Sequence, residues 1–220
     1  IKSGAGNDVT NDGYQTSMQL NIPLIKEALS VQLTGNCYNQ DETDYVGATS
    51  NTSGDPEFKR RNLGAKFGWK LNNQNSVTFG ADRTNLERTR TPGKSIAETD
   101  DASYSKSIRD NFFVAHEGRY DDMLWESYLT YDDQKNPTRV NATTGNSIKF
   151  DTLTANTQAT WFLSSHTLSV GANYKRQNLQ DGASNGLNLP GISMSTDLIS
   201  MKRTQYALFA EDNWQLTDEL

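Results

Sequence analysis

Hydrophobic and polar side chains alternate with period two along much of the chain. The clearest run is 14–22, where Tyr14, Met18 and Leu20 share one face and Gln15 lies on the other. Such alternation is typical of a β-strand with one apolar and one polar face. The pattern recurs and predicts nine strands, at about residues 14–22, 29–36, 62–71, 77–82, 112–120, 125–132, 153–161, 168–175 and 206–215.

The connections between these strands alternate in length. Short connections are predicted at 23–27, 72–75, 121–122 and 163–165, and long ones at 39–57, 88–105, 133–148 and 176–202. Soluble domains seldom contain several structureless loops beyond about 12–15 residues. Barrels of the bacterial outer membrane have short turns on one side and long loops on the other. The sequence contains no apolar run of about 18 residues for a membrane helix. The expected fold is therefore all-β, an antiparallel up-and-down transmembrane β-barrel.

Aromatic residues divide between the two ends of the predicted strands. The tryptophans lie near short turns and share the apolar face: Trp69, Trp125, Trp161 and Trp214. Five tyrosines lie near long loops: Tyr14, Tyr38, Tyr131, Tyr174 and Tyr206. Two aromatic girdles at the membrane interfaces would produce this division, which a general preference of aromatics for strands does not explain. Asp212 falls on the apolar face, so we expect a bulge or a membrane-edge position there.

Composition narrows the alternatives. The chain has 220 residues, a net charge of −6 and only 34% hydrophobic residues, which is low for a soluble core, although a soluble β-sandwich stays open as an alternative. The acidic balance argues against nucleic acid as a partner. The single cysteine, Cys37, excludes a disulfide framework within the chain. Bacterial barrels have even strand numbers, so nine strands, and a start at Ile1 without a signal peptide, indicate a fragment.

Candidate catalytic chemistry is sparse. The two histidines, His116 and His166, are far apart in sequence, and an interfacial polar role fits them better than a metal or catalytic one. The adjacent carboxylates Asp100–Asp101 and Asp132–Asp133 are predicted in loops, where solvated charge is the common explanation. A barrel hydrolase using such an acidic pair stays open as an alternative. We expect no catalytic residue, no metal site and no cofactor.

The C-terminal segment carries a family resemblance. Residues 206–218, with the run Leu-Phe-Ala-Glu-Asp followed by Leu-Thr-Asp, resemble a mid-barrel strand of TonB-dependent outer-membrane receptors. Residues 165–172 resemble the strand that precedes it, Asp181-Gly182 lies in the matching loop, and 62–67 agree more loosely. Similarity is greatest to the branch of ferric-catecholate and colicin I receptors.

This resemblance implies a plug domain followed by a barrel of about 22 strands that imports ferric siderophores or cobalamin. Residues 1–220 would then form a partial β-barrel domain, with the plug and the C-terminal strands outside it. Implied partners are outer-membrane lipid and lipopolysaccharide, the TonB complex through the missing plug region, and colicins or phages at the long loops. A passive outer-membrane channel or an adhesin barrel without energy coupling is the alternative.

Arginines flank two of the long loops and are the candidate ligand-binding residues: Arg60, Arg61, Arg83, Arg88 and Arg90. A ferric catecholate complex is a trianion with an aromatic exterior, so guanidinium groups and tyrosines would suit it. The alternative is that these arginines pair with loop carboxylates or with anionic lipopolysaccharide. The expected function is uptake of a ferric siderophore through the bacterial outer membrane, with no enzymatic step.

Overall fold

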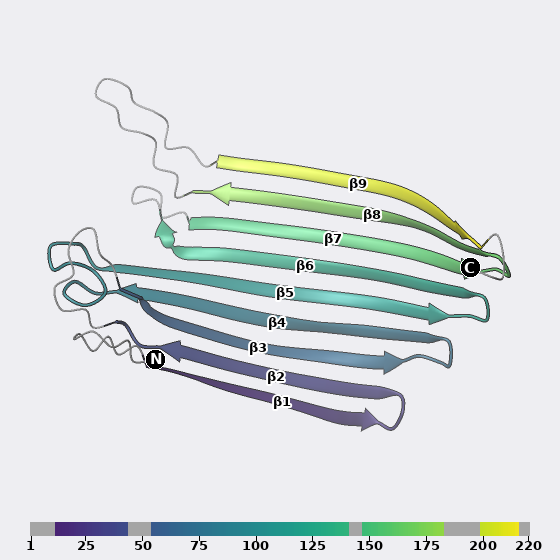
Figure 1. The fold of residues 1–220 in the computed structure, drawn as a ribbon, viewed down its shortest axis with the longest axis horizontal. Helices are drawn as coiled ribbons and strands as arrows, with labels where there is room; N and C mark the ends of the chain where they lie inside the picture. Colours follow the sequence, from purple (N-terminus) through teal and green to yellow (C-terminus); the bar gives the residue numbers. More distant parts are fainter. Residues whose placement is uncertain (1–11, 44–53, 141–146, 183–198, 216–220) are drawn as a thin grey trace, which may run out of the picture.

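The computed structural model describes residues 12–43, 54–140, 147–182 and 199–215, which form one antiparallel sheet. Each strand pairs with the next along the chain, and the sheet is a single curved layer (Figure 1). Nine strands were predicted, and the described residues contain nine. They are β1 Gly13–Ile25, β2 Leu29–Gln40, β3 Glu57–Lys70, β4 Asn75–Arg90, β5 Ser103–Arg119, β6 Met123–Val140, β7 Ser147–Phe162, β8 His166–Asp181 and β9 Ile199–Trp214.

Short turns occupy one end of the sheet, and the strand ends that lead into the longer connections lie at the other (Figure 1). The four short connections lie where the sequence predicted them. The strands, however, are longer than predicted, with 12 to 18 residues each. The largest difference is β6, which continues to Val140 through most of the predicted loop 133–148. Backbone pairing with β7 extends the strand there, although the alternation of apolar and polar side chains has ended.

The two faces of the sheet differ in chemistry. The outer face is the side of Leu33, Ala65, Phe79 and Leu129, and the inner face is the side of their neighbours along each strand. Register keeps the apolar rows together, since Leu33 pairs with Ala65 and Ala65 with Ala81.

No second layer covers either face within the described part of the chain. Leu63 is 69% exposed and Leu208 86% exposed, and the buried hydrophobic residues there are Val31 and Ala97. A soluble β-sandwich would bury its apolar rows between two sheets. That alternative is therefore wrong for the described residues, which include no helix long and apolar enough to cross a membrane.

The tryptophans all lie on the outer face, as predicted, and their positions drift along the sheet. The register row of Trp69 passes through Ser127, Thr157 and Leu208. The other tryptophans lie progressively nearer the short turns than this row. The displacement is two residues for Trp125 in β6, four for Trp161 in β7 and six for Trp214 in β9. The drift is six residues over six strands.

The tyrosines of the outer face drift in the same direction. Tyr14 of β1 pairs with Asn39. The register row that contains Tyr174 and Tyr206 crosses β1 at Ile22, which is eight residues nearer the short turn than Tyr14. Strands of a barrel tilt against its axis, so a band of constant height must slide steadily along successive strands. Parallel drift of tyrosines and tryptophans is therefore the geometry expected of two interfacial girdles.

Asp212 and both histidines lie near the short turns. The sequence predicted either a bulge at Asp212 or a position at the membrane edge. The pairing of β8 with β9 is regular there, so the position at the edge of the apolar band is the explanation that fits. His166 Nδ1 lies 3.0 Å from the Asp212 carboxylate, and its ring stacks on Trp214 with centroids 5.4 Å apart. His116 instead packs edge-on against Trp125, with ring centroids 4.9 Å apart.

A half-buried carboxylate joins the two connections that follow β2 and β4. Glu42 accepts hydrogen bonds from the backbone N–H of Thr91 and the hydroxyl of Ser95, which is fully buried. The N–H of Gly54 donates to the Ser95 carbonyl at 2.8 Å. Burial acts to raise the pKa of Glu42, but the hydrogen bonds from Ser95 and Thr91 outweigh it, so this pKa is lowered. We call this set of contacts the Glu42 latch.

Replacing Leu129 with arginine tests which face meets lipid. An arginine near the middle of a lipid-facing strand costs about 2–4 kcal/mol of folding free energy. We expect that cost for Leu129→Arg in the full-length protein folded into bilayers, measured by guanidinium unfolding. The matched variant Thr130→Arg, one residue along on the inner face, should cost less than about 1 kcal/mol. Equal costs at the two positions would contradict the assignment of faces.

The Glu42 latch should depend on pH. Because the pKa of folded Glu42 lies below its ordinary 4.5, the latch is fully stabilising above that pH and weakens as the pH falls through the lowered value. Glu42→Gln should mimic acid at neutral pH and speed hydrogen exchange at the Thr91 and Gly54 amides by about tenfold, since a hydrogen bond to a charge contributes roughly 1.5–3 kcal/mol. Glu98→Gln, in the same loop, is the control. Unchanged exchange in Glu42→Gln would show that the latch does not hold the loops.

Candidate functional site

Two arginines and two aromatic rings meet on the inner face near the long-loop end of β2, β3 and β4. The Arg60 guanidinium carbon lies 5.9 Å from the centroid of the Tyr38 ring, and that of Arg88 lies 5.5 Å from the Phe58 ring. The two rings contact each other edge to face at 5.7 Å. We call these four residues the inner cluster.

Register explains how the inner cluster forms. Arg60 pairs directly with Tyr38 on β2, and Phe58 pairs with Arg88 on β4. Directly opposed side chains in an antiparallel sheet lie on the same face, about 4.5–5.5 Å apart at Cβ. Phe58 and Arg60 are two residues apart on β3 and therefore share that face as well. The cluster thus comes from three adjacent strands.

The charge of the inner cluster is open to a ligand. Arg60 and Arg88 are both exposed, and neither belongs to an ion pair among the described residues. The Tyr38 hydroxyl donates to Gln40 Oε1 at 2.7 Å, which fixes the ring. The Glu42 latch closes the loops that continue from β2 and β4, immediately beyond the cluster.

The five arginines predicted as one group have three different positions. Arg60 and Arg88 belong to the inner cluster. Arg90 lies on the same face, where its Nη1 donates to the Gly54 carbonyl at 3.1 Å and so braces the loop. Arg61 and Arg83 lie on the outer face, in register with Asn85 and Leu63. They point away from the inner cluster, and ligand binding by these two arginines stays a prediction.

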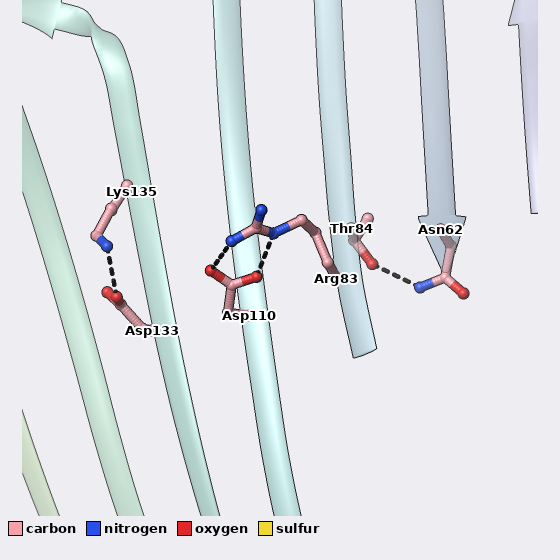
Figure 2. Close-up of polar contacts among 6 residues, drawn as sticks. All are labelled: Asn62, Arg83, Thr84, Asp110, Asp133 and Lys135. Atoms are coloured by element: carbon pink, nitrogen blue, oxygen red, sulfur yellow. Dashed lines mark hydrogen bonds and ion pairs between the residues drawn. The ribbon is translucent and has the colours of Figure 1, made fainter. Parts of the chain in front are cut away.

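Arg83 forms an ion pair with Asp110 of the neighbouring strand, as Figure 2 shows. The contact is bidentate, with Arg83 Nη2 2.7 Å from Asp110 Oδ2. Lys135 and Asp133 form a second pair at 2.7 Å on the same outer face (Figure 2). The sequence left open the alternative that these arginines pair with carboxylates. The structure contains such a pair for Arg83.

Tyr38 also differs from the prediction. It was grouped with the interfacial tyrosines, but it pairs with Gln15 and Arg60 and so lies on the inner face, opposite to Tyr14. Sequence reasoning missed Phe58 altogether. The sequence could have indicated it. Phe58 is separated from Arg60 and Asn62 by even numbers of residues, so it shares their face of the strand, and it is an aromatic residue on an otherwise polar face.

The acidic pair Asp132–Asp133 does not form a catalytic dyad. Both residues lie within β6 rather than in a loop, so their side chains point to opposite faces. Asp132 accepts from Arg109 Nη2 at 2.6 Å and from Asn111 at 3.0 Å, whereas Asp133 pairs with Lys135. Across the described ranges, no group of three potential metal ligands occurs.

Comparisons with known proteins agree with this geometry. No family model matches the chain. The chain is 27% identical over 220 residues to the iron-regulated outer membrane virulence protein of Vibrio cholerae serotype O1. That match covers 97% of the chain and 30% of the relative, so the chain spans less than a third of the protein it resembles.

Solved structures with the same fold are larger proteins of which this chain covers about a third. The ferric enterobactin receptor PfeA of Pseudomonas aeruginosa matches with a TM-score of 0.76 and 21% identity, over 96% of this chain and 36% of that one. The siderophore receptor PirA of Acinetobacter baumannii matches with a TM-score of 0.78 and 18% identity, over 96% and 35%. The copper transporter OprC matches with a TM-score of 0.64 and 16% identity, over 99% and 36%.

Three predictions from the sequence are thereby confirmed. The described strands have the all-β, antiparallel up-and-down fold of these receptor barrels. The resemblance to TonB-dependent siderophore receptors holds over nearly the whole chain. The location, the bacterial outer membrane, agrees with the apolar outer face and with the relative from Vibrio cholerae.

Proposed function

We propose that this chain is part of the barrel of a TonB-dependent receptor that binds and imports a ferric siderophore of the catecholate type. The observation that carries the proposal is the inner cluster, in which Arg60 and Arg88 lie against Tyr38 and Phe58 at the long-loop end of the inner face. Long loops of outer-membrane barrels face the cell exterior, so a ligand arriving from outside would meet this cluster.

The chemistry of the inner cluster suits a flat aromatic anion. A guanidinium group can form charge-assisted hydrogen bonds to catecholate oxygens and can also stack on a ring. Hydrogen bonds to charged groups contribute about 1.5–3 kcal/mol each, and a cation–π contact adds roughly 0.5–2 kcal/mol depending on its desolvation. Two such arginines beside two rings would discriminate a trianionic aromatic complex from a neutral one.

The proposal also concerns the rest of the barrel. β1 and β9 each pair on one side only among the described residues, and in a membrane an unpaired strand edge costs several kcal/mol per backbone group. We therefore propose that further strands complete the barrel and that a plug couples it to the TonB complex. In this scheme the chain supplies wall and ligand contacts and performs no bond chemistry.

Fold alone does not identify the cargo. The copper transporter OprC shares the fold, and a passive channel or an adhesin could be built on a similar wall. The inner cluster favours a siderophore over these cargoes, because neither a copper ion nor a passive solute requires paired rings and guanidinium groups on one face.

The double variant Arg60→Gln plus Arg88→Gln tests the ligand. In the full-length receptor we expect the dissociation constant for a ferric tris-catecholate to rise about 10- to 100-fold, because two cationic contacts are lost. Titration calorimetry or fluorescence quenching would measure it. The matched control is Arg61→Gln plus Arg83→Gln, which removes the same charge from the outer face of the same two strands and should leave affinity unchanged.

A neutral ferric hydroxamate serves as the control ligand. If the receptor bound the hydroxamate more tightly than the catecholate, the catecholate assignment would be wrong. If the inner-face and outer-face variants weakened binding equally, net charge rather than the inner cluster would explain the affinity.

A further inference from the structure

The Glu42 latch lies directly beyond the inner cluster, on continuations of the same three strands. Each strand carries a cluster residue and, three or four residues farther toward the long loops, a latch residue. The pairs are Tyr38 and Glu42 after β2, Phe58 and Gly54 before β3, and Arg88 and Thr91 after β4. A strand rises about 3.3 Å per residue, so roughly 10–13 Å separate the latch from the cluster.

Backbone pairing extends beyond the ends of β2 and β3 as far as the latch. The Thr43 N–H donates to the Asp55 carbonyl at 3.0 Å, and this pair continues the register in which Gln40 opposes Phe58. The Thr43 hydroxyl accepts from the Asp55 N–H at 3.0 Å, and Thr43 is only 3% exposed. A shift of the latch would therefore move the strand ends that carry the cluster.

A tight turn after β4 delivers Ser95 to the latch. Gly93 has a φ of +78°, a left-handed conformation that glycine adopts without steric cost. Its N–H donates to the Ile96 carbonyl at 2.9 Å. The turn leaves Ser95 fully buried, with its hydroxyl on the Glu42 carboxylate. Each latch contact is thus fixed by local backbone structure on both sides.

The inner cluster has few restraints of its own. Within the described ranges, Arg60 and Arg88 form no ion pair, and each lies against one aromatic ring. Cation–π contacts at exposed sites are weak, so they hold the two guanidinium groups loosely. Arg90, which lies between Arg88 and Thr91, donates from Nη1 to the Gly54 carbonyl at 3.1 Å. The end of β4 is therefore tied to the latch immediately beside a cluster arginine.

We propose that Glu42 is a positioning residue, and that the Glu42 latch holds Arg60 and Arg88 at the spacing that an anionic aromatic ligand requires. This inference rests on the proposed function for the identity of the ligand. A site that is held in its binding arrangement beforehand loses less conformational freedom when the ligand arrives. Apparent affinity falls in proportion to the fraction of molecules that keep this arrangement. Glu42 itself touches no ligand in this scheme.

The sign of the effect separates positioning from direct electrostatics. Glu42 is a negative charge near a site for a trianion, so Glu42→Gln would strengthen binding if charge alone acted. If the latch positions the cluster, Glu42→Gln in the full-length receptor should weaken the binding of a ferric tris-catecholate about fivefold. Ser95→Ala removes a latch hydrogen bond and keeps the charge, so it should weaken binding as well. The matched control Glu98→Gln removes the same charge from the connection after β4 and should bind at least as tightly as the parent.

A second measurement needs no ligand. 4-Fluorophenylalanine incorporated in place of Phe58 would report the packing of this ring by ¹⁹F NMR of the full-length receptor in bilayers. We expect one resonance in the parent and in Glu98→Gln, and broadened or additional resonances in Glu42→Gln and in Ser95→Ala. Ser95→Ala alone decides the matter if Glu42→Gln fails to fold. An unchanged spectrum in the latch variants overturns the proposal.

The binding data decide independently. Weaker binding by both latch variants, with the control unaffected, supports the proposal. Tighter or unchanged binding by Glu42→Gln overturns it, and so does a loss that Ser95→Ala does not share. Because coupling between two sites is reciprocal, the ligand should slow hydrogen exchange at the Thr91 and Gly54 amides by about the same factor of five. If the parent bound no ferric tris-catecholate, the proposed function would be wrong, and the ¹⁹F spectra would still decide whether the latch positions the cluster.

Discussion

Backbone hydrogen bonding in a medium without water is the constraint on which the rest of the structure depends. A strand inside hydrocarbon must pair every N–H and C=O with its neighbours, and each inner strand from β2 to β8 is paired on both sides. Once the strands are fixed in this way, alternate side chains must face lipid and lumen. A single layer whose apolar side chains remain exposed, such as Leu63 and Leu208, is stable only where lipid covers it. The slant of the two girdles follows from the same pairing.

The features that we propose to be functional lie where the strands extend beyond the apolar band. There the hydrogen-bonded ladder continues, but both faces are polar, so the sheet can carry a ligand site on one side and charge on the other. The inner cluster and the Glu42 latch both lie in this zone. Adjacent residues such as Arg60 and Arg61 consequently have unrelated environments, one beside Tyr38 and the other on the outer face.

The sequence predicted the membrane-spanning part of this fold well and the part above it poorly. Between Leu63 and Trp69, alternation is enforced by lipid, so strand, face and turn could all be read from it. Beyond that band the alternation fades, which is why β6 appeared to end near Asp132 and the pair Asp132–Asp133 looked like a loop. Parity counted from Leu63 would have placed Arg61 on the outer face. The Glu42 latch could not have been found, because it joins loops 49 residues apart in sequence and leaves no periodic signal.

Accessibility of spin labels along β3 is the most direct test of which face meets lipid. Cys37→Ser would remove the native thiol, and single cysteines at 62 to 69 in the full-length protein would carry nitroxides in bilayers. We predict that collision with oxygen, which concentrates in hydrocarbon, peaks at 63, 65, 67 and 69 and falls at the positions between. A scan without period two, or with its maxima at 62, 64, 66 and 68, would contradict a barrel wall whose apolar rows face lipid.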